Sequence, residues 1–111
     1  MHEYGVALDI VDLALKTAGG RHITKVNLRI GALSGISGES LAMYLELILG
    51  ERQAGAPAVV VTAVAARFKC SCGNEYAPGK LFDPCPSCSG FDRITIDGNE
   101  CAIESIEVDD D

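Results

Sequence analysis

Residues 68–92 read FKCSCGNEYAPGKLFDPCPSCSGFD and differ in composition from the rest of the chain. They hold four of the five cysteines, three of the four prolines and all three phenylalanines, with little hydrophobic periodicity. A segment this short cannot form a core from apolar area alone. We therefore predict a separate small module that a bound metal stabilises.

The cysteines of this stretch are spaced as two close pairs, Cys70–Cys72 and Cys85–Cys88, with twelve residues between them. Two chelating pairs joined by a loop supply the four corners of a tetrahedral thiolate site, which suits Zn²⁺. A rubredoxin-like iron site could use the same four thiolates. No histidine or carboxylate ligand is interleaved at metal-ligand spacing, so we expect a structural metal and not a catalytic one. The first pair has one residue between its cysteines where two are usual.

The sequence on either side of the module has the hydrophobic periodicity of helices and strands. Before the module we predict a helix over 4–18, a strand over 23–30, a second helix over 38–50 and a strand over 59–64. The first helix has an apolar stripe at helical spacing, made by Tyr4, Leu8, Val11, Leu15 and Ala18 and widened by Val6, Ile10 and Leu13. In the first strand Thr24, Val26, Leu28 and Ile30 are predicted to share one face. Ser37 is the predicted N-cap of the second helix and Gly50 its stop.

After the module the pattern predicts a strand over 94–96, a turn at Asp97-Gly98 and a strand over 101–108. The whole order predicts an α+β fold: a sheet of three or more strands with two helices on one face, and an inserted zinc-ribbon-like module. The corresponding domains are an α+β domain over 1–66, completed by 93–111, and a zinc-binding module over 67–92.

Length and composition exclude several classes of protein. A chain of 111 residues, 48% hydrophobic and 23% charged, predicts one globular domain with at most a small appendage. Nine Lys and Arg against 16 Asp and Glu give a net charge of −7, which argues against nucleic-acid binding. No apolar run reaches the roughly 20 residues of a membrane span, and no secretory signal precedes the first helix. We expect a cytoplasmic protein, where thiols are more often metal ligands than disulfides.

Two further residues could be ligands but have simpler interpretations. Cys101 lies alone in a predicted strand, where a free cysteine packs as a small hydrophobe; it remains a reserve metal ligand. His22 follows a turn and is predicted to be a surface histidine. Nothing in the sequence pairs a nucleophile with a base, so we predict that the protein is not an enzyme.

The N-terminus offers a second metal site. The α-amine of Met1 and the amide and imidazole nitrogens of His2 can form fused chelate rings, a nitrogen-rich donor set that suits Ni(II) or Cu(II). The simpler interpretation is that His2 is frayed and that Glu3 favours the start of a helix.

The chain resembles the HypA family of hydrogenase nickel-insertion proteins along essentially its whole length. The resemblance is carried by Met1-His2-Glu3-Tyr4, Leu28-Arg29-Ile30-Gly31, the paired cysteines, and Gly98-Asn99-Glu100 with Ile103-Glu104-Ser105-Ile106-Glu107. Two features depart from the family pattern, namely the short first cysteine pair and the additional thiol of Cys101.

The resemblance implies a nickel metallochaperone. Met1, His2 and backbone nitrogens near Glu3 would bind Ni(II), and the four paired cysteines would bind structural zinc. The implied partners are the GTPase HypB and the large-subunit precursor of [NiFe]-hydrogenase, and in some organisms urease maturation proteins; members are monomers or homodimers. Glu39 would be the nearest match to an acidic side chain that some members place by the nickel. The alternative is a zinc-ribbon protein-interaction module without a nickel function, and after it an iron-containing electron carrier.

Overall fold

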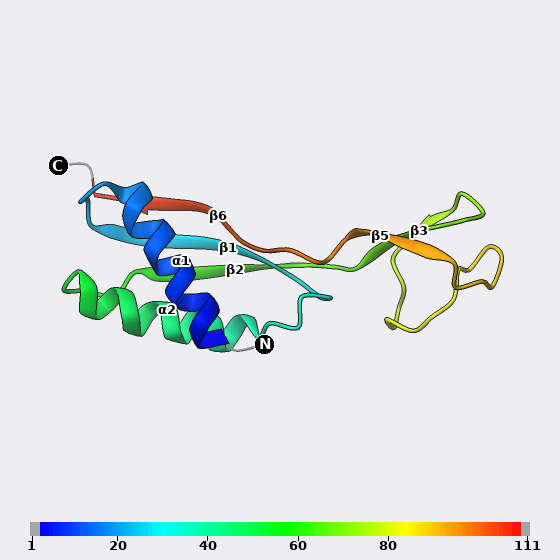
Figure 1. The fold of residues 1–111 in the computed structure, drawn as a ribbon, viewed down its shortest axis with the longest axis horizontal. Coiled ribbons are helices and arrows are strands. Elements are labelled where there is room, and N and C mark those ends of the chain that lie inside the picture. The colour runs from blue at the N-terminus through cyan, green and yellow to red at the C-terminus, as the bar shows by residue number, and fades with distance from the viewer. Residues whose placement is uncertain (1–2, 110–111) are drawn as a thin grey trace.

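Two small sheets lie end to end, so that the molecule is 56 Å long but only 26 × 18 Å across (Figure 1). The computed structural model describes residues 3–109. In chain order its elements are α1 (Glu3–Ala18), β1 (Ile23–Gly31), α2 (Gly38–Arg52), β2 (Ala58–Val64), β3 (Arg67–Cys70), β4 (Glu75–Tyr76), β5 (Arg93–Asp97) and β6 (Cys101–Val108).

The first sheet has the strand order β2-β1-β6 and carries both helices. β1 runs parallel to β2, with α2 as the crossover between them, and antiparallel to β6. The two helices contact each other and share one hydrophobic core with this sheet, which places them on the same face. The predicted α+β fold with two helices on one face and a module inserted between two strands is confirmed.

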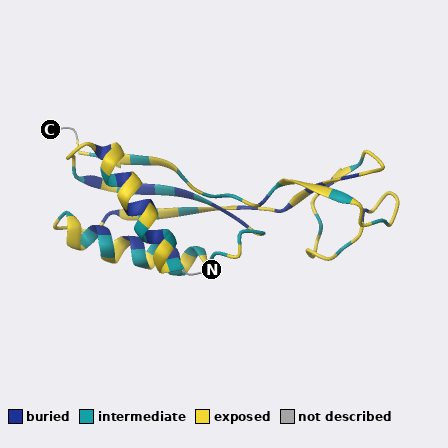
Figure 2. Cartoon of the chain, viewed as in Figure 1, coloured by how far each residue is buried: buried dark blue, intermediate teal, exposed yellow. Residues whose placement is uncertain are grey.

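The core of the first sheet differs in detail from the predicted helical stripe. In α1 the predicted stripe residues Ile10, Val11 and Ala18 are buried, together with Ala7 and Ala14, while Leu13 is 55% exposed and Tyr4 52% exposed. The buried face of α1 therefore combines three alanines with Ile10 and Val11, and buried and exposed positions are interspersed along the helix (Figure 2). The Tyr4 ring packs edge-on against Tyr44 of α2, with ring centroids 5.4 Å apart.

At the start of β1, the residue that faces the core differs from the predicted one. Val26, Leu28 and Ile30 are buried as predicted, but Ile23 is buried in place of Thr24. The pairing of β1 with β6 shifts register between Ile23 and Lys25, so the alternation of faces is interrupted there.

The predicted start of α2 is confirmed and its predicted end is wrong. The Ser37 side chain accepts a hydrogen bond from the Ser40 N–H at 3.2 Å, as an N-cap does. The helix then continues through Gly50 to Arg52, and the left-handed residue that turns the chain is Ala54, with φ 56°. Gly50 lies inside the helix and packs against Ala56, where a Cβ would be in ordinary van der Waals contact at 3.4 Å from the Ala56 side chain.

The second sheet has the order β4-β3-β5 and belongs to the cysteine module. The two strands on either side of the predicted turn at Asp97-Gly98 do not pair with each other, because β5 pairs with β3 whereas β6 pairs with β1. The chain crosses from one sheet to the other at residues 98–100. The pairing of β5 with β3 places residues 93–97 in the same sheet as Cys70. The domain boundary at residue 92 remains a prediction.

Backbone hydrogen bonds connect the end of β1 and the loop after it to residues 98–100, where the chain passes from the second sheet to the first. Gly31 donates to the Glu100 carbonyl at 2.7 Å, and Leu33 donates to the Gly98 carbonyl at 2.8 Å. Gly31 has no room for a side chain, because a Cβ there would overlap the Gly98 carbonyl. Leu33 also packs against the small core of the cysteine module.

Among residues 3–109, the helices are all too short or too polar to cross a membrane.

Candidate metal centres

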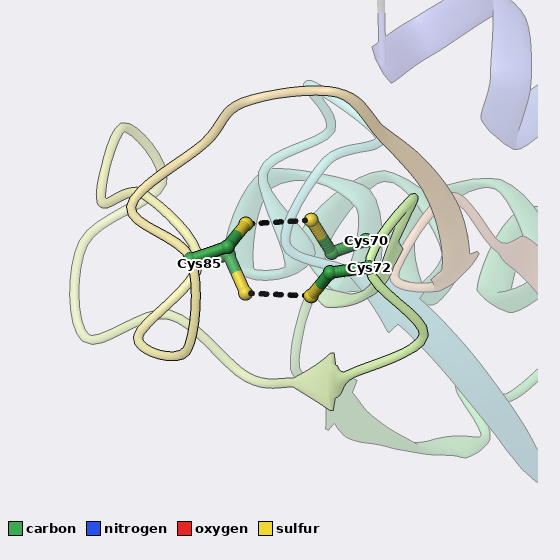
Figure 3. Close-up of side chains that lie close together, drawn as sticks. Cys70, Cys72 and Cys85 are labelled. Atoms are coloured by element: carbon green, nitrogen blue, oxygen red, sulfur yellow. Dashed lines mark hydrogen bonds between the residues drawn. The ribbon is translucent and has the colours of Figure 1, made fainter.

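The four predicted zinc ligands come together in the second sheet. Cys70 ends β3, Cys72 lies in the turn after it, and Cys85 and Cys88 belong to the loop between β4 and β5. Their sulfur atoms all lie within 4.8 Å of one another. The Sγ atoms of Cys70 and Cys88 are 3.4 Å apart, and those of Cys72 and Cys85 are 3.7 Å apart. Figure 3 shows Cys85 facing Cys70 and Cys72 across the site.

Each pair of cysteines is held by a tight turn. After the first pair, Gly73 donates to the Cys70 carbonyl at 2.9 Å, and its φ of +97° suits glycine. In the second pair, Ser89 donates to the Cys85 carbonyl at 2.8 Å and has a φ of +61°. The turn at Gly73 brings both sulfurs of the short pair to one side, so the single spacer residue does not prevent convergence.

The thiols are electrostatically unequal. Burial raises the pKa of Cys85, but N–H groups of Cys88 and Ser87 and the side chains of Asn74 and Cys72 outweigh it and lower this pKa to about 6. At Cys88 the Gly90 N–H lowers the pKa, but the thiols of Cys70 and Cys72 raise it to about 12. Four thiols this close together cannot all ionise without a cation, because the negative charges repel one another. A bound metal ion would allow all four to coordinate as thiolates.

The donor set and its spacing suit zinc. Four sulfurs at the usual Zn–S distance of 2.3 Å in a tetrahedron are separated by about 3.8 Å. The Sγ···Sγ distances of 3.4 and 3.7 Å are close to that value. Two of the cysteines, Cys70 and Cys85, are buried, and the other two are exposed. Four thiolates would leave no open position, which is the pattern of a structural site.

Sequence reasoning missed two residues that support this site. Asn74 places its side-chain nitrogen 3.6 Å from the Cys85 sulfur. Arg93 stacks 3.9 Å over the Phe68 ring, and it donates to the carbonyls of Leu81 at 2.7 Å and Asp83 at 2.8 Å. It thereby anchors to the sheet the loop that leads to the second cysteine pair. Neither residue belongs to a ligand motif, so nothing in the spacing indicated them.

The predicted nickel ligands are only partly described. Met1 and His2 lie outside the described residues, and Glu3 begins α1 as a half-buried residue. Glu39 is exposed in the first turn of α2, where a carboxylate favours the helix N-terminus.

The two remaining candidates lie apart from the cysteine cluster. Cys101 packs against the core of the first sheet, and burial raises the pKa of its thiol. His22 is half-buried and lies beside Gly55 at the end of the molecule where both helices end. The sulfur cluster of the described residues is therefore made by the four paired cysteines without Cys101.

The sequence model of a family described as "Hydrogenase/urease nickel incorporation, metallochaperone, hypA" matches residues 1–108. The chain belongs to the HypA family. The hydrogenase maturation factor HypA of Caldanaerobacter subterraneus subsp. tengcongensis is 37% identical over 115 residues, covering 98% of this chain and 100% of the relative. That of Geobacter metallireducens is 32% identical over 110 residues, with coverages of 98% and 100%.

The fold is also that of HypA proteins. The solution structure of the Ni metallochaperone HypA from Helicobacter pylori superimposes with a TM-score of 0.66 at 24% identity, covering 97% of each chain. At that identity the likeness concerns the fold. The family match therefore places this chain in a family of nickel-incorporation metallochaperones for hydrogenase and urease.

Proposed function

We propose that the protein binds Ni(II) at its N-terminus and delivers it to the large-subunit precursor of [NiFe]-hydrogenase. The α-amine of Met1, the nitrogens of His2 and the backbone near Glu3 would form the nickel site. The observation that carries the proposal is the family match, which begins at residue 1 and therefore includes this tripeptide.

The proposed donors set the properties of delivery. An amide nitrogen and an imidazolium must each lose a proton before they bind a metal, so nickel affinity should fall as the pH falls. Nitrogen donors bind Cu(II) more tightly than Ni(II). Selectivity for nickel would therefore depend on metal availability and on contacts with the partner proteins.

The proposed role of the second metal is structural. Cys70, Cys72, Cys85 and Cys88 would hold zinc, which supplies a cross-link between β3 and the loop before β5. Within residues 3–109, the module core is small, and its buried residues are Ala66, Phe68, Cys70, Tyr76 and Cys85. So small a core needs such a cross-link. No catalytic role is proposed for any residue of the chain.

The proposed partners follow from the same function. They are the GTPase HypB and the hydrogenase large-subunit precursor, with urease maturation proteins where urease is also served, and the proposed compartment is the cytoplasm. The protein would act as a monomer or homodimer.

The test compares two histidine variants of the zinc-loaded protein. His2→Ala should abolish tight Ni(II) binding measured by calorimetry, while His22→Ala, the matched control, should bind like the wild type. Tight nickel binding by His2→Ala would contradict the proposal. If none of the three proteins bound nickel, the chain would be a zinc-ribbon interaction module instead.

A further inference from the structure

The two edge strands of the first sheet differ in how they are protected against pairing. β6 carries Glu104 and Glu107, which pair with Arg29 at 3.6 Å and Lys25 at 3.7 Å, and its register against β1 shifts twice. Charges and bulges of this kind keep an edge strand from pairing with other chains. We expect β6 to remain an edge.

The other edge strand has none of these protections. β2 has the sequence AVVVTAV, without a charge or a proline, and it pairs with β1 in unbroken register over seven residues. Within the described part of the chain, the outer side of residues 58–63 makes no hydrogen bond to another element. Val60 on this strand is 41% exposed. An uncharged, regular and unpaired edge is a template for a further strand.

An apolar hollow adjoins this edge at the start of α2. It has a volume of about 460 Å³, and the residues that line it include Ile36, Gly38, Val61 and Ala63. Gly38 keeps the hollow open toward β2, because a Cβ there would lie 3.0 Å from the Val61 side chain. A strand added to β2 could place an aliphatic side chain in this hollow, which is how added strands gain specificity.

The charge of the surroundings indicates what kind of strand this would be. Residues 67–97 contain four Lys and Arg and four Asp and Glu, so the net charge of −7 comes entirely from the rest of the chain. Tyr44 marks the side of α2 that contacts Tyr4 of α1. At 100° per residue, the exposed residues Glu39 and Glu46 lie roughly on the opposite side of the helix. They therefore face away from α1, toward the β2 edge. Basic residues flanking an added strand would complement them.

A second copy of the chain is a poorer occupant. Pairing β2 with β2 would bring the acidic flanks of two α2 helices together. The edge is also only roughly 23 Å long at 3.3 Å per residue, too little for a standard dimer interface of about 800 Å² on each partner. A short extended segment needs no larger surface than this edge and its hollow.

We propose that the free edge of β2, with the hollow beside it, binds an extended segment of a partner protein by strand addition. The segment has β-branched or aliphatic residues at its centre and Lys or Arg at its ends. This site is independent of nickel binding. A negative result in the test below would therefore leave the proposed nickel function unchanged.

The test uses the zinc-loaded protein without nickel and a blocked nine-residue peptide, KKVTVTVKK. Backbone NMR shifts should change for residues 58–65 on titration with the peptide, and amides of this strand should exchange more slowly with solvent. A peptide with glutamates in place of the lysines should bind at least tenfold more weakly.

Two matched variants locate the site, because Ala63 and Ala102 are both exposed alanines on edge strands of the same sheet. Ala63→Lys should weaken peptide binding at least tenfold, while Ala102→Lys should change it less than twofold. The proposal is overturned if the lysine peptide leaves residues 58–65 unshifted at millimolar concentration, or if the two variants weaken binding equally. Sedimentation showing a dimer that Ala63→Lys alone dissociates would assign the edge to a second copy instead.

Discussion

Replacing Gly31 by alanine perturbs the junction between the two sheets at its most crowded point. The new Cβ would overlap the Gly98 carbonyl, which accepts the Leu33 hydrogen bond at 2.8 Å. Relief of the overlap must move the chain at 98–100 and disturb the bond from Gly31 to the Glu100 carbonyl at 2.7 Å as well. Overpacking costs about 1–3 kcal/mol, and each backbone hydrogen bond contributes about 0.5–1.5 kcal/mol. We therefore expect Gly31→Ala to lower the free energy of unfolding by about 4 kcal/mol.

The assay is urea unfolding of the zinc-loaded protein followed by far-UV circular dichroism, which reports α1 and α2. Gly5→Ala is the matched control, because a Cβ at Gly5, inside α1, meets nothing within 4 Å. That variant should be more stable than the wild type by up to about 1 kcal/mol, since alanine favours a helix interior. If Gly31→Ala were as stable as the wild type, the junction would not be fastened in the way the hydrogen bonds indicate.

Three further predictions concern other contacts. Gln53→Ala removes side-chain hydrogen bonds to the Ile23 N–H at 2.9 Å and the Ile23 carbonyl at 2.7 Å, and should lower the free energy of unfolding by about 2 kcal/mol in the same assay. The N–H groups of Glu100 itself and of Gly98 lower the pKa of the Glu100 carboxyl in the folded protein. The ionised carboxyl therefore stabilises the fold above the unfolded pKa of about 4.3, and this stabilisation is lost as the pH falls through the folded pKa. Glu100→Gln should therefore be less stable than the wild type at pH 7 and equally stable at strongly acidic pH, as urea titrations across this range would show. Cys88→Ser should lose bound zinc, measured by elemental analysis, while Cys101→Ser keeps it; stoichiometric zinc in Cys88→Ser would contradict the four-thiolate site.

The parts of the fold that the sequence predicted are those with local causes. Hydrophobic periodicity predicted both helices and β1 and β2, and Ser37 predicted the start of α2 because an N-cap is a contact between near neighbours. The cluster of four cysteines was predicted from their spacing, since the geometry of each close pair is also local.

The errors arose where partners distant in sequence decide the outcome. Nothing near residues 94–96 shows that β5 pairs with β3 and not with β6. Gly50 resembled a helix stop, but α2 continues through it to Arg52 and the chain turns at Ala54. The buried face of α1 is set by its contacts with α2 and the sheet, and Leu13, at the margin of the predicted stripe, is 55% exposed. The role of Arg93 depends on carbonyls ten and twelve residues away, which no motif records.

The proposed function requires the N-terminal amine to take part in nickel binding. The most direct measurement is calorimetric Ni(II) titration of the zinc-loaded protein that begins at Met1, beside the same protein with one residue added before Met1. The extension leaves every side chain in place and moves the amine away from His2. We predict tight one-to-one binding by the first protein and its loss in the second. Equal binding by both would contradict the proposal and move the site to internal side chains.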